Sequence, residues 1–142
     1  MRKDLRVEDL DGFLDEPRLA IVATLRADGS VLLSPVWHEW RDGGFNVWVQ
    51  AGNAKTRHLR RDPRVTIVVA EADQPMRGVE LRGSARFIED DVTETAQRIA
   101  ARYVGDEEAA AYVGTLRGTD VIVRIEPGAL RIWDYAGEFD AD

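Results

Sequence analysis

The sequence has no cysteine, only two histidines and no long apolar run. Without cysteine the chain can form no disulfide, no thiolate-ligated iron–sulfur cluster and no thiol nucleophile. No segment approaches the ~20 consecutive apolar residues that a membrane-spanning helix needs, and charges are scattered through the N-terminal residues. We therefore expect a soluble, cytoplasmic protein that uses neither membrane insertion nor thiol chemistry.

The chain also lacks the linkers, repeats and low-complexity tracts that separate domains. Its 142 residues suffice to bury one core, so we predict a single domain over residues 1–142. Positive charge is in deficit, because the formal net charge is -7 at pH 7. Nucleic-acid binding requires a predominantly positive face, and this balance argues against a nucleic-acid partner.

The apolar residues follow mainly the period of β-strands. Alternation and short apolar runs predict about seven strands, at Leu19–Leu25, Val31–Trp40, Phe45–Gln50, Val65–Glu71, Val79–Ile88, Val121–Glu126 and Ala129–Tyr135. Turn-forming dipeptides at Asp28-Gly29 and Asp42-Gly43 join the first three strands into an antiparallel meander. Pro127-Gly128 predicts a closing hairpin between the last two strands.

Fewer segments have helical spacing. We expect a short leading helix over residues 7–14 and a short cationic helix over Lys55–Asp62. Asp91 begins a pattern that resembles a capping box, which predicts a helix over Val92–Tyr103, and a weaker helix is expected over Asp106–Leu116. Many strands with a few short helices indicate a mainly β fold, a closed or partly closed barrel.

The cationic helix concentrates positive charge in this acidic chain. The segment Asn53–Val65 reads NAKTRHLRRDPRV and contains Lys55 and four arginines. It follows a predicted strand directly, and Asn53 is a favourable N-cap. Because a helix N-terminus offers free N–H groups and a partial positive charge, we interpret the cluster as an anion site. For any single arginine, a solvated helix face is the alternative interpretation.

Two ordered motifs resemble a known family. The segments LAIVATLRADGSVLLSPVWHEW and FNVWVQAGNAKTRHLRRDPRVTIVV are similar to the flavin- and deazaflavin-binding split β-barrel superfamily, which includes pyridoxamine-phosphate oxidase. The pattern is nearest to the branch that uses coenzyme F-420. It covers about the first two thirds of the chain, and the last third matches in outline. The resemblance implies a split β-barrel of the pyridoxamine-phosphate oxidase type.

The resemblance also implies which residues hold the cofactor. In this family a Lys-x-Arg pattern at a strand-to-helix segment binds the cofactor phosphate, which here implies Lys55 and Arg57. The strand with the Ser-Pro-Val-Trp residues lies along the tricyclic ring. The full implied set is Ser34, Pro35, Val36 and Trp37 at the ring, Val49 and Gln50 at the ribityl chain, Asn53, Ala54, Lys55, Thr56 and Arg57 at the phosphate, and Arg60 and Arg61 beyond it.

Coenzyme F-420 is the preferred cofactor, and FMN is the alternative. FMN ends at its phosphate, whereas coenzyme F-420 continues into a tail that carries further carboxylates. Arg60, Arg61 and Arg64 exceed what one phosphate needs, although they could pair with surface acids for about 0–1 kcal/mol each. The implied reaction is hydride transfer between the reduced deazaflavin and a conjugated small-molecule substrate, with the difficult chemistry supplied by the cofactor.

Such chemistry requires neither a catalytic triad nor a metal ion, and the sequence predicts neither. His38 is a candidate proton donor to the substrate, with a structural histidine as the favoured alternative. His58 lies within the cationic helix and could assist the anion site. Aromatic walls suit a conjugated ligand. Core packing is nevertheless expected for Trp48 more than for Trp37 or Trp133.

The resemblance further implies a homodimer with the cofactor between the subunits. The apolar strands outnumber what one small barrel can hide, which agrees with such an interface. Trp133, Asp134 and Tyr135 are candidates for contact with the partner subunit or the substrate. Gln74–Met76 and the C-terminal residues 136–142 are candidate rim elements.

Three rival functions stay open at this point. The first is an FMN-dependent oxidase or reductase of the same fold, which flavin absorption of the purified protein would indicate. The second is a haem-binding relative, in which His38 or His58 would be the ligand. The third is a non-catalytic protein that stores or shields the deazaflavin, which coenzyme binding without turnover would indicate.

Overall fold

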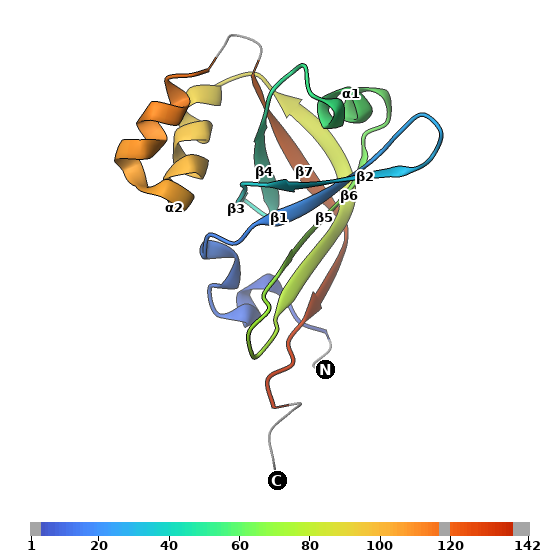
Figure 1. Ribbon diagram of the computed structural model, residues 1–142. Helices are drawn as coiled ribbons and strands as arrows, with labels where there is room; N and C mark the ends of the chain where they lie inside the picture. The colour runs from blue at the N-terminus through green and yellow to red at the C-terminus, as the bar shows by residue number, and fades with distance from the viewer. Residues whose placement is uncertain (1–3, 117–119, 138–142) are drawn as a thin grey trace.

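The computed structural model of the protein describes residues 4–116 and 120–137, and these form one curled antiparallel sheet with flanking helices (Figure 1). The strands follow the order β2-β1-β5-β6-β7-β4-β3 across the sheet. The expected mainly β class is confirmed. The elements are η1 (Val7–Leu10), η2 (Phe13–Asp15), β1 (Ala20–Leu25), β2 (Val31–Val36), β3 (Glu39–Arg41), β4 (Gly44–Val49), α1 (Ala54–Arg61), β5 (Arg64–Ala70), β6 (Gly78–Ile88), α2 (Val92–Val113) and β7 (Val121–Trp133), where η marks a 3-10 helix.

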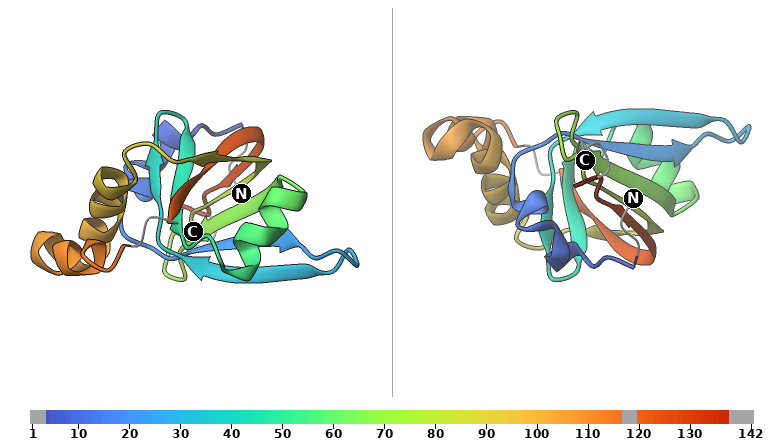
Figure 2. Two further views of the ribbon diagram at one scale, coloured as in Figure 1. Left: turned by 90° about the horizontal axis from the view of Figure 1, so that it is seen from above. Right: turned by 90° about the horizontal axis from the view of Figure 1, so that it is seen from below.

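The long strands β6 and β7 bend the sheet. β6 pairs with β5 as far as Ser84 and then continues to Ile88 beside β7 alone. β7 pairs with β4 through its first residues, Val121–Ile125. Because the two long strands have different neighbours along their lengths, the sheet curls into a partial barrel, as the view from above in Figure 2 shows.

Alternate residues of the strands point into the curl and form the core. In β5, Val65, Ile67 and Val69 are buried, whereas Thr66 and Val68 are only partly buried. This strand lies between β1 and β6 inside the sheet, and only one of its faces belongs to the core. η1 and η2 close the lower end of the curl in Figure 1 with the buried side chains Leu10, Phe13 and Leu14.

The strand predicted over Val31–Trp40 is split in two. β2 pairs with β1, whereas β3 pairs with β4 at the opposite edge of the sheet. Both hairpin turns are confirmed, with positive φ at Gly29 (87°), Asp42 (52°) and Gly43 (77°). The two hairpins are not adjacent, so the predicted meander is wrong. The reason is tertiary, because side chains far along the sequence bind the backbone of His38 between the two strands.

The predicted closing hairpin is also wrong. β7 continues without a turn through Pro127, which stands opposite Gly83 where the register of β6 and β7 shifts. The ladder is already interrupted at such a bulge, so the missing N–H of proline costs little there. Gly83 permits the close approach of the two strands, because a Cβ on it would lie 1.9 Å from the carbonyl oxygen of Glu126.

Helical structure occurs in each segment for which it was predicted, but the type and the ends of some helices differ. The leading helix is instead the pair η1 and η2, since Asp11 and Gly12 between them have φ of 55° and 76°. α1 confirms the cationic helix, and α2 contains both later helices, separated at Gly105. The capping box is wrong, because Asp91 is left-handed and its side chain caps no N–H of the described helix. Within the described residues, no helix is long and apolar enough to cross a membrane.

Replacing Gly83 with alanine should destabilise the protein by about 2 kcal/mol or more, because the backbone at the bulge must move to admit a methyl group. Urea unfolding followed by circular dichroism would show this as a lower midpoint. Gly52→Ala is the matched control, since a Cβ there would meet no atom within 4 Å, and its stability should change by less than about 0.5 kcal/mol. Equal midpoints for the two variants would contradict the close approach at Gly83.

Candidate functional site

A groove of about 390 Å³ lies where the end of β2, the strand β4 and the start of α1 meet. Two indole rings and three apolar side chains form its walls. Among the described residues that line it, Lys55 is the one cation. The lining consists of Leu19, Pro35, Val36, Trp37, Trp48 and Lys55.

α1 begins beside this groove with a well-formed cap. The Oδ1 atom of Asn53 accepts a hydrogen bond from the N–H of Thr56 at 3.2 Å, and the Thr56 hydroxyl lies 2.8 Å from the carbonyl oxygen of Gln50. The first two helical N–H groups belong to Ala54 and Lys55, and helix geometry leaves them without an intrahelical acceptor. These groups and the helix dipole favour an anion at this point.

Lys55 adds a cation that the chain itself does not neutralise. The side chain is partly buried, and burial lowers its pKa from the ordinary value. Burial is the sole cause of this shift, so no carboxylate of the described residues compensates the charge. A partly desolvated cation costs free energy unless a ligand supplies the negative charge. The groove is therefore chemically suited to an anion held beside flat apolar walls.

Comparison with known proteins identifies the family. The family model described as pyridoxamine 5'-phosphate oxidase matches residues 7–134. The chain belongs to this family. The seven-stranded curled sheet is accordingly its split-barrel fold, so the resemblance read from the sequence motifs and the fold it implied are both confirmed. Among curated proteins no match is found.

Solved structures of similar proteins agree with this fold. A conserved hypothetical protein from Mycobacterium tuberculosis has a TM-score of 0.85 and 27% identity, over 100% of this chain and 94% of that one. An F-420 reductase has a TM-score of 0.70 and 23% identity, over 85% and 94% of the chains. The haem storage protein HutZ from Vibrio cholerae has a TM-score of 0.71 and 18% identity, over 93% and 95%. At these identities the last two show the shared fold alone.

In this relative of pyridoxamine 5'-phosphate oxidase, only some of the residues implied to bind the cofactor lie together. Arg57 is exposed in the first turn of α1, and its Nη1 donates to the carbonyl oxygen of Gly52 at 2.7 Å. Asn53 and Ala54 adjoin Lys55 at the start of the helix. Four members of the implied set line the groove itself: Pro35, Val36, Trp37 and Lys55.

Other members of the implied set have different surroundings. Ser34 pairs with Val22 in the β1–β2 ladder and does not line the groove. Val49 is buried in the core, so it could offer a ligand only its backbone. Thr56 is fully buried, and its N–H and hydroxyl serve the cap of α1. Gln50 is exposed at the end of β4, with its carbonyl oxygen engaged by Thr56.

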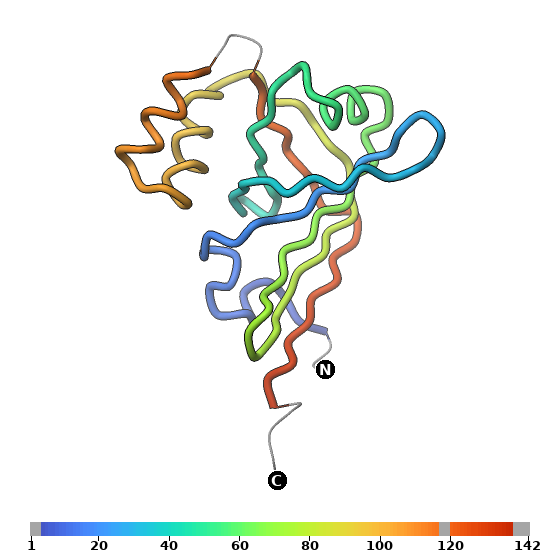
Figure 3. The backbone as a smooth tube through the Cα atoms, in the orientation of Figure 1, coloured from blue at the N-terminus to red at the C-terminus, as the bar shows by residue number. Residues whose placement is uncertain are grey.

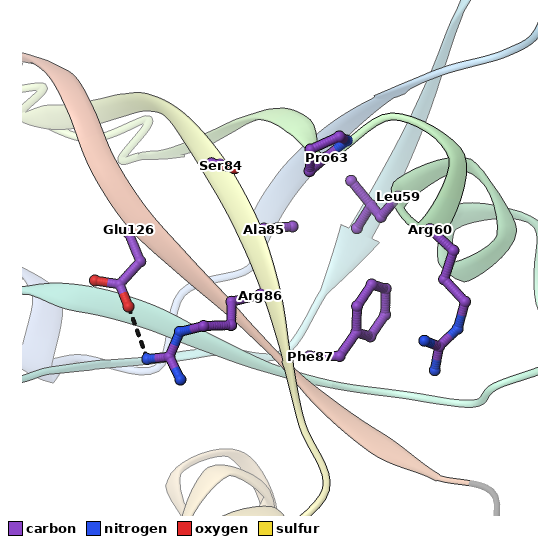
Figure 4. Close-up of a pocket in the computed structure, with 8 residues that line it drawn as sticks. All are labelled: Leu59, Arg60, Pro63, Ser84, Ala85, Arg86, Phe87 and Glu126. Carbon is purple, nitrogen blue, oxygen red and sulfur yellow. Dashed lines mark hydrogen bonds and ion pairs between the residues drawn. The ribbon is translucent and has the colours of Figure 1, made fainter.

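Arg60 lies in a separate and larger pocket, of about 720 Å³, on the β6 side of α1 (Figure 4). Its guanidinium stacks over the Phe87 ring, 4.1 Å from the ring centroid. Arg61 instead donates to the carbonyl oxygen of Leu25. The structure therefore does not bring Arg60 and Arg61 to the groove that Lys55 lines.

Trp48 lines the groove, although core packing was expected for this residue. Its neighbours Val47 and Val49 are buried in the core, so strand alternation places Trp48 on the other face of β4. There its Nε1 donates to Asp120 at 3.3 Å. Alternation along β4 was the signal that could have identified it. Leu19, the other residue missed, precedes β1 and carries no comparable signal.

His38 is fully buried and does not line the groove. Its Nε2 donates to the carbonyl oxygen of Arg18 at 3.1 Å, and its Nδ1 has no hydrogen-bond partner within the described residues. Burial, together with the nearby Arg102 guanidinium, lowers its pKa to about 4. His38 is thus neutral at pH 7 and enclosed. This placement favours the structural interpretation over that of a proton donor.

His58, on α1, forms a hydrogen bond with the strand β1. Its Nδ1 lies 2.9 Å from the hydroxyl of Thr24, and burial together with Arg61 lowers its pKa. The part of the chain that the structure describes contains no cluster of His, Asp or Glu that could hold a metal ion. Neither histidine is presented to the groove as a ligand.

The residues predicted to contact the partner subunit or the substrate lie at the end of β7 away from α1 (Figure 1): Trp133, Asp134 and Tyr135. The indole of Trp133 covers Gly78, and the N–H of Tyr135 donates to Pro75 at 3.0 Å. Within one chain they are remote from the groove, and their contact with a partner stays a prediction. The candidate rim segment Gln74–Met76 lies at the same end, and residues 138–142 are outside the described residues.

His38 should make the protein less stable in mild acid. The folded state holds its pKa near 4 whereas the unfolded chain titrates near 6.5, so the unfolded state binds more protons between these values. The free energy of unfolding is therefore highest above pH 6.5 and decreases as the pH falls toward 4. At pH 4.5 the decrease due to His38 is about 2 kcal/mol. Urea unfolding at pH 7 and 4.5 measures this loss.

His38→Gln is the control for that measurement, because glutamine does not titrate and still offers a donor to Arg18. The carboxylates contribute equally in both proteins, so the difference between their pH dependences reports His38 alone. An equal loss of stability in wild type and variant would show that His38 is not held neutral.

Proposed function

We propose that this protein is an oxidoreductase that binds coenzyme F-420 in the groove at the start of α1. It would transfer a hydride between the reduced coenzyme and a conjugated small-molecule substrate. The observation that carries this proposal is Lys55, a partly buried cation without a compensating carboxylate among the described residues, in a groove walled by Trp37 and Trp48.

The residues of the groove fit a coenzyme that has a planar ring and a phosphate. Lys55 and the N–H groups of Ala54 and Lys55 would hold the phosphate, since charge-assisted hydrogen bonds to phosphate are among the stronger ones. Pro35, Trp37 and Trp48 offer flat apolar surface for the ring. Pro35 lies on the edge strand β2. Because proline has no backbone N–H, it leaves no donor unpaired at this edge, and its ring remains available to a ligand.

The bound coenzyme supplies the hydride chemistry. The chain then has to orient two flat molecules and to exclude water from them. As walls of the groove, Trp37 and Trp48 would limit the orientation of a bound ring and replace water with apolar surface. Lys55 fixes the position of the coenzyme along the groove through its phosphate. Orientation of this kind is a large part of what an enzyme contributes to a reaction between two bound molecules.

Coenzyme F-420 is preferred to FMN because of the motif resemblance and the structural similarity to an F-420 reductase. The number of arginines supports this choice less than the sequence suggested. Arg64 is paired with Asp62 at 2.7 Å, and Arg61 binds the carbonyl oxygen of Leu25. Arg57, which the resemblance implies for the phosphate, is exposed in the first turn of α1 and could also meet a carboxylate of the tail.

A haem-binding function has less support in this chain. The similarity to HutZ is one of fold. The Nε2 of His38 is buried and engaged with Arg18, and the Nδ1 of His58 is engaged with Thr24. An FMN-dependent enzyme and a non-catalytic coenzyme-binding protein remain the alternatives, and binding and turnover measurements separate them.

We also propose that a second copy of the chain covers the groove. In a monomer the outer face of β1 and β2 would be exposed to solvent, and a solvent-exposed face is usually polar. Here it is apolar. It consists of Ile21, Ala23, Leu25, Val31, Leu33 and Pro35. Leu33 is 64% exposed and Val31 is 49% exposed. Pro35, at the end of this face, and Leu19, next to it, are exposed and also line the groove. A copy packed here would bury the face and close the groove.

Coenzyme F-420 should bind the purified protein more tightly than FMN in a titration followed by fluorescence quenching. Lys55→Ala should weaken this binding by more than about 1.5 kcal/mol, because the phosphate loses a charged partner. Arg64→Ala is the matched control, since Arg64 belongs to the same cationic segment but is paired with Asp62 and 77% exposed. Its affinity should equal that of wild type.

Weak binding of equal strength by wild type and Lys55→Ala would reject the assignment of the groove. Tighter binding of FMN than of coenzyme F-420, with the same sensitivity to Lys55→Ala, would instead establish the FMN alternative. Tight coenzyme binding without turnover of any electron acceptor would indicate the storage function.

Leu33→Asp should convert a dimer into a monomer in sedimentation velocity experiments, because it places a charge at the centre of the apolar face. Ala110→Asp adds the same charge on an exposed position of α2 and should leave the dimer intact. A wild-type protein that sediments as a monomer, or a Leu33→Asp variant that stays dimeric, would contradict this interface.

A further inference from the structure

Trp37 connects the groove to two tyrosines of α2. It lines the groove, and its ring is stacked on Tyr103 with the centroids 5.0 Å apart and the planes 6° apart. Tyr112 meets the same indole edge-on, with the centroids 5.3 Å apart and the planes at 73°. A single side chain of the groove is thus surrounded by aromatic rings from a helix that carries none of the cofactor residues implied by the motifs.

Tyr103 holds Trp37 in place from behind. Its hydroxyl donates to the carbonyl oxygen of Arg18 at 2.8 Å and accepts from the N–H of His38 at 3.1 Å. Burial raises the pKa of Tyr103, so the hydroxyl stays protonated at neutral pH. Since both contacts are to backbone atoms of the barrel, Tyr103 is a fixed support that sets the plane of the indole.

Tyr112 reaches Trp37 only because α2 is broken at Gly105. Tyr103 and Tyr112 are nine residues apart, which in a continuous α-helix would separate them by about 13 Å along the axis. Gly105 has φ 83° and ψ 166°, a conformation that residues with a Cβ rarely adopt. It turns the second arm of α2 back beside the first, as the tube in Figure 3 shows. The break therefore places both tyrosines on one indole.

The two tyrosines differ in exposure. Tyr103 is partly buried, whereas Tyr112 is 47% exposed although it is a large aromatic residue. Tyr112 does not itself line the groove, but its contact with Trp37 forms an aromatic corner between the groove and α2. Such a corner suits a planar ligand, because one ring can stack on its face while the other contacts its edge.

We propose that Tyr112 is a specificity-determining residue, which with Trp37 forms the subsite for the planar, conjugated substrate beside the coenzyme ring. The inference rests on the proposed function for the identity of that neighbouring ring. The subsite itself is built from side chains of this chain, so ligand binding tests it without any turnover.

Menadione, a planar naphthoquinone, is the probe. Equilibrium dialysis measures its binding to the purified full-length protein. The measurement is made without coenzyme and again with saturating oxidised coenzyme F-420. Tyr112→Ala should weaken menadione binding at least fivefold in both conditions, while the affinity for coenzyme F-420 changes less than twofold. Tyr112→Phe keeps the ring and should bind menadione within twofold of wild type.

Gly105→Ala displaces the same ring by another route, because alanine disfavours the backbone conformation that turns the second arm. It should also weaken menadione binding at least fivefold, with the far-ultraviolet circular dichroism of the barrel retained. Agreement between the two variants would assign the effect to the position of Tyr112.

Wild-type affinity for menadione in Tyr112→Ala would overturn the subsite, and so would a wild-type protein that does not bind menadione. Sensitivity to Tyr112→Ala in a protein that binds neither coenzyme F-420 nor FMN would support the subsite and reject the proposed function. Tight coenzyme binding together with a menadione affinity that does not depend on Tyr112 would support the proposed function and reject the subsite.

Discussion

Hydrogen bonds around His38 hold the point where the chain leaves one edge of the sheet and joins the other. The N–H of His38 donates to the hydroxyl of Tyr103, its carbonyl oxygen accepts from Arg102, and its Nε2 donates to the carbonyl oxygen of Arg18. Because these contacts satisfy backbone groups that a strand ladder would otherwise use, β2 can end at Val36 and β3 can start on the opposite edge.

This crossing also shapes the groove. Trp37 immediately precedes His38, so its indole is held where the strand has ended, against Tyr103 and beside the groove. Arg102 extends the same set of contacts to the carbonyl oxygens of Leu14 and Glu16. The aromatic wall of the groove therefore depends on α2, although the anion end depends only on the cap of α1. One site is assembled from a local motif and a long-range one.

Features set by a few neighbouring residues could be predicted. Asn53 caps α1, and Gly29 and Gly43 form hairpin turns, as the sequence indicated. Pro127-Gly128 misled because the same dipeptide suits a turn and a bulge, and pairing with Gly83 of β6 selected the bulge. Asp91 misled because a good capping residue was placed in a left-handed conformation.

The sequence by itself determined the family, the mainly β class and the cationic helix with its cap, because motif order, strand period and capping are properties of short segments. The tertiary structure decided that Trp48 faces the groove, that Arg60 and Arg61 turn away from it, and that Tyr112 meets Trp37. Those outcomes depend on which distant segments pack together, and the free energy of such packing is not encoded in any one stretch of the chain.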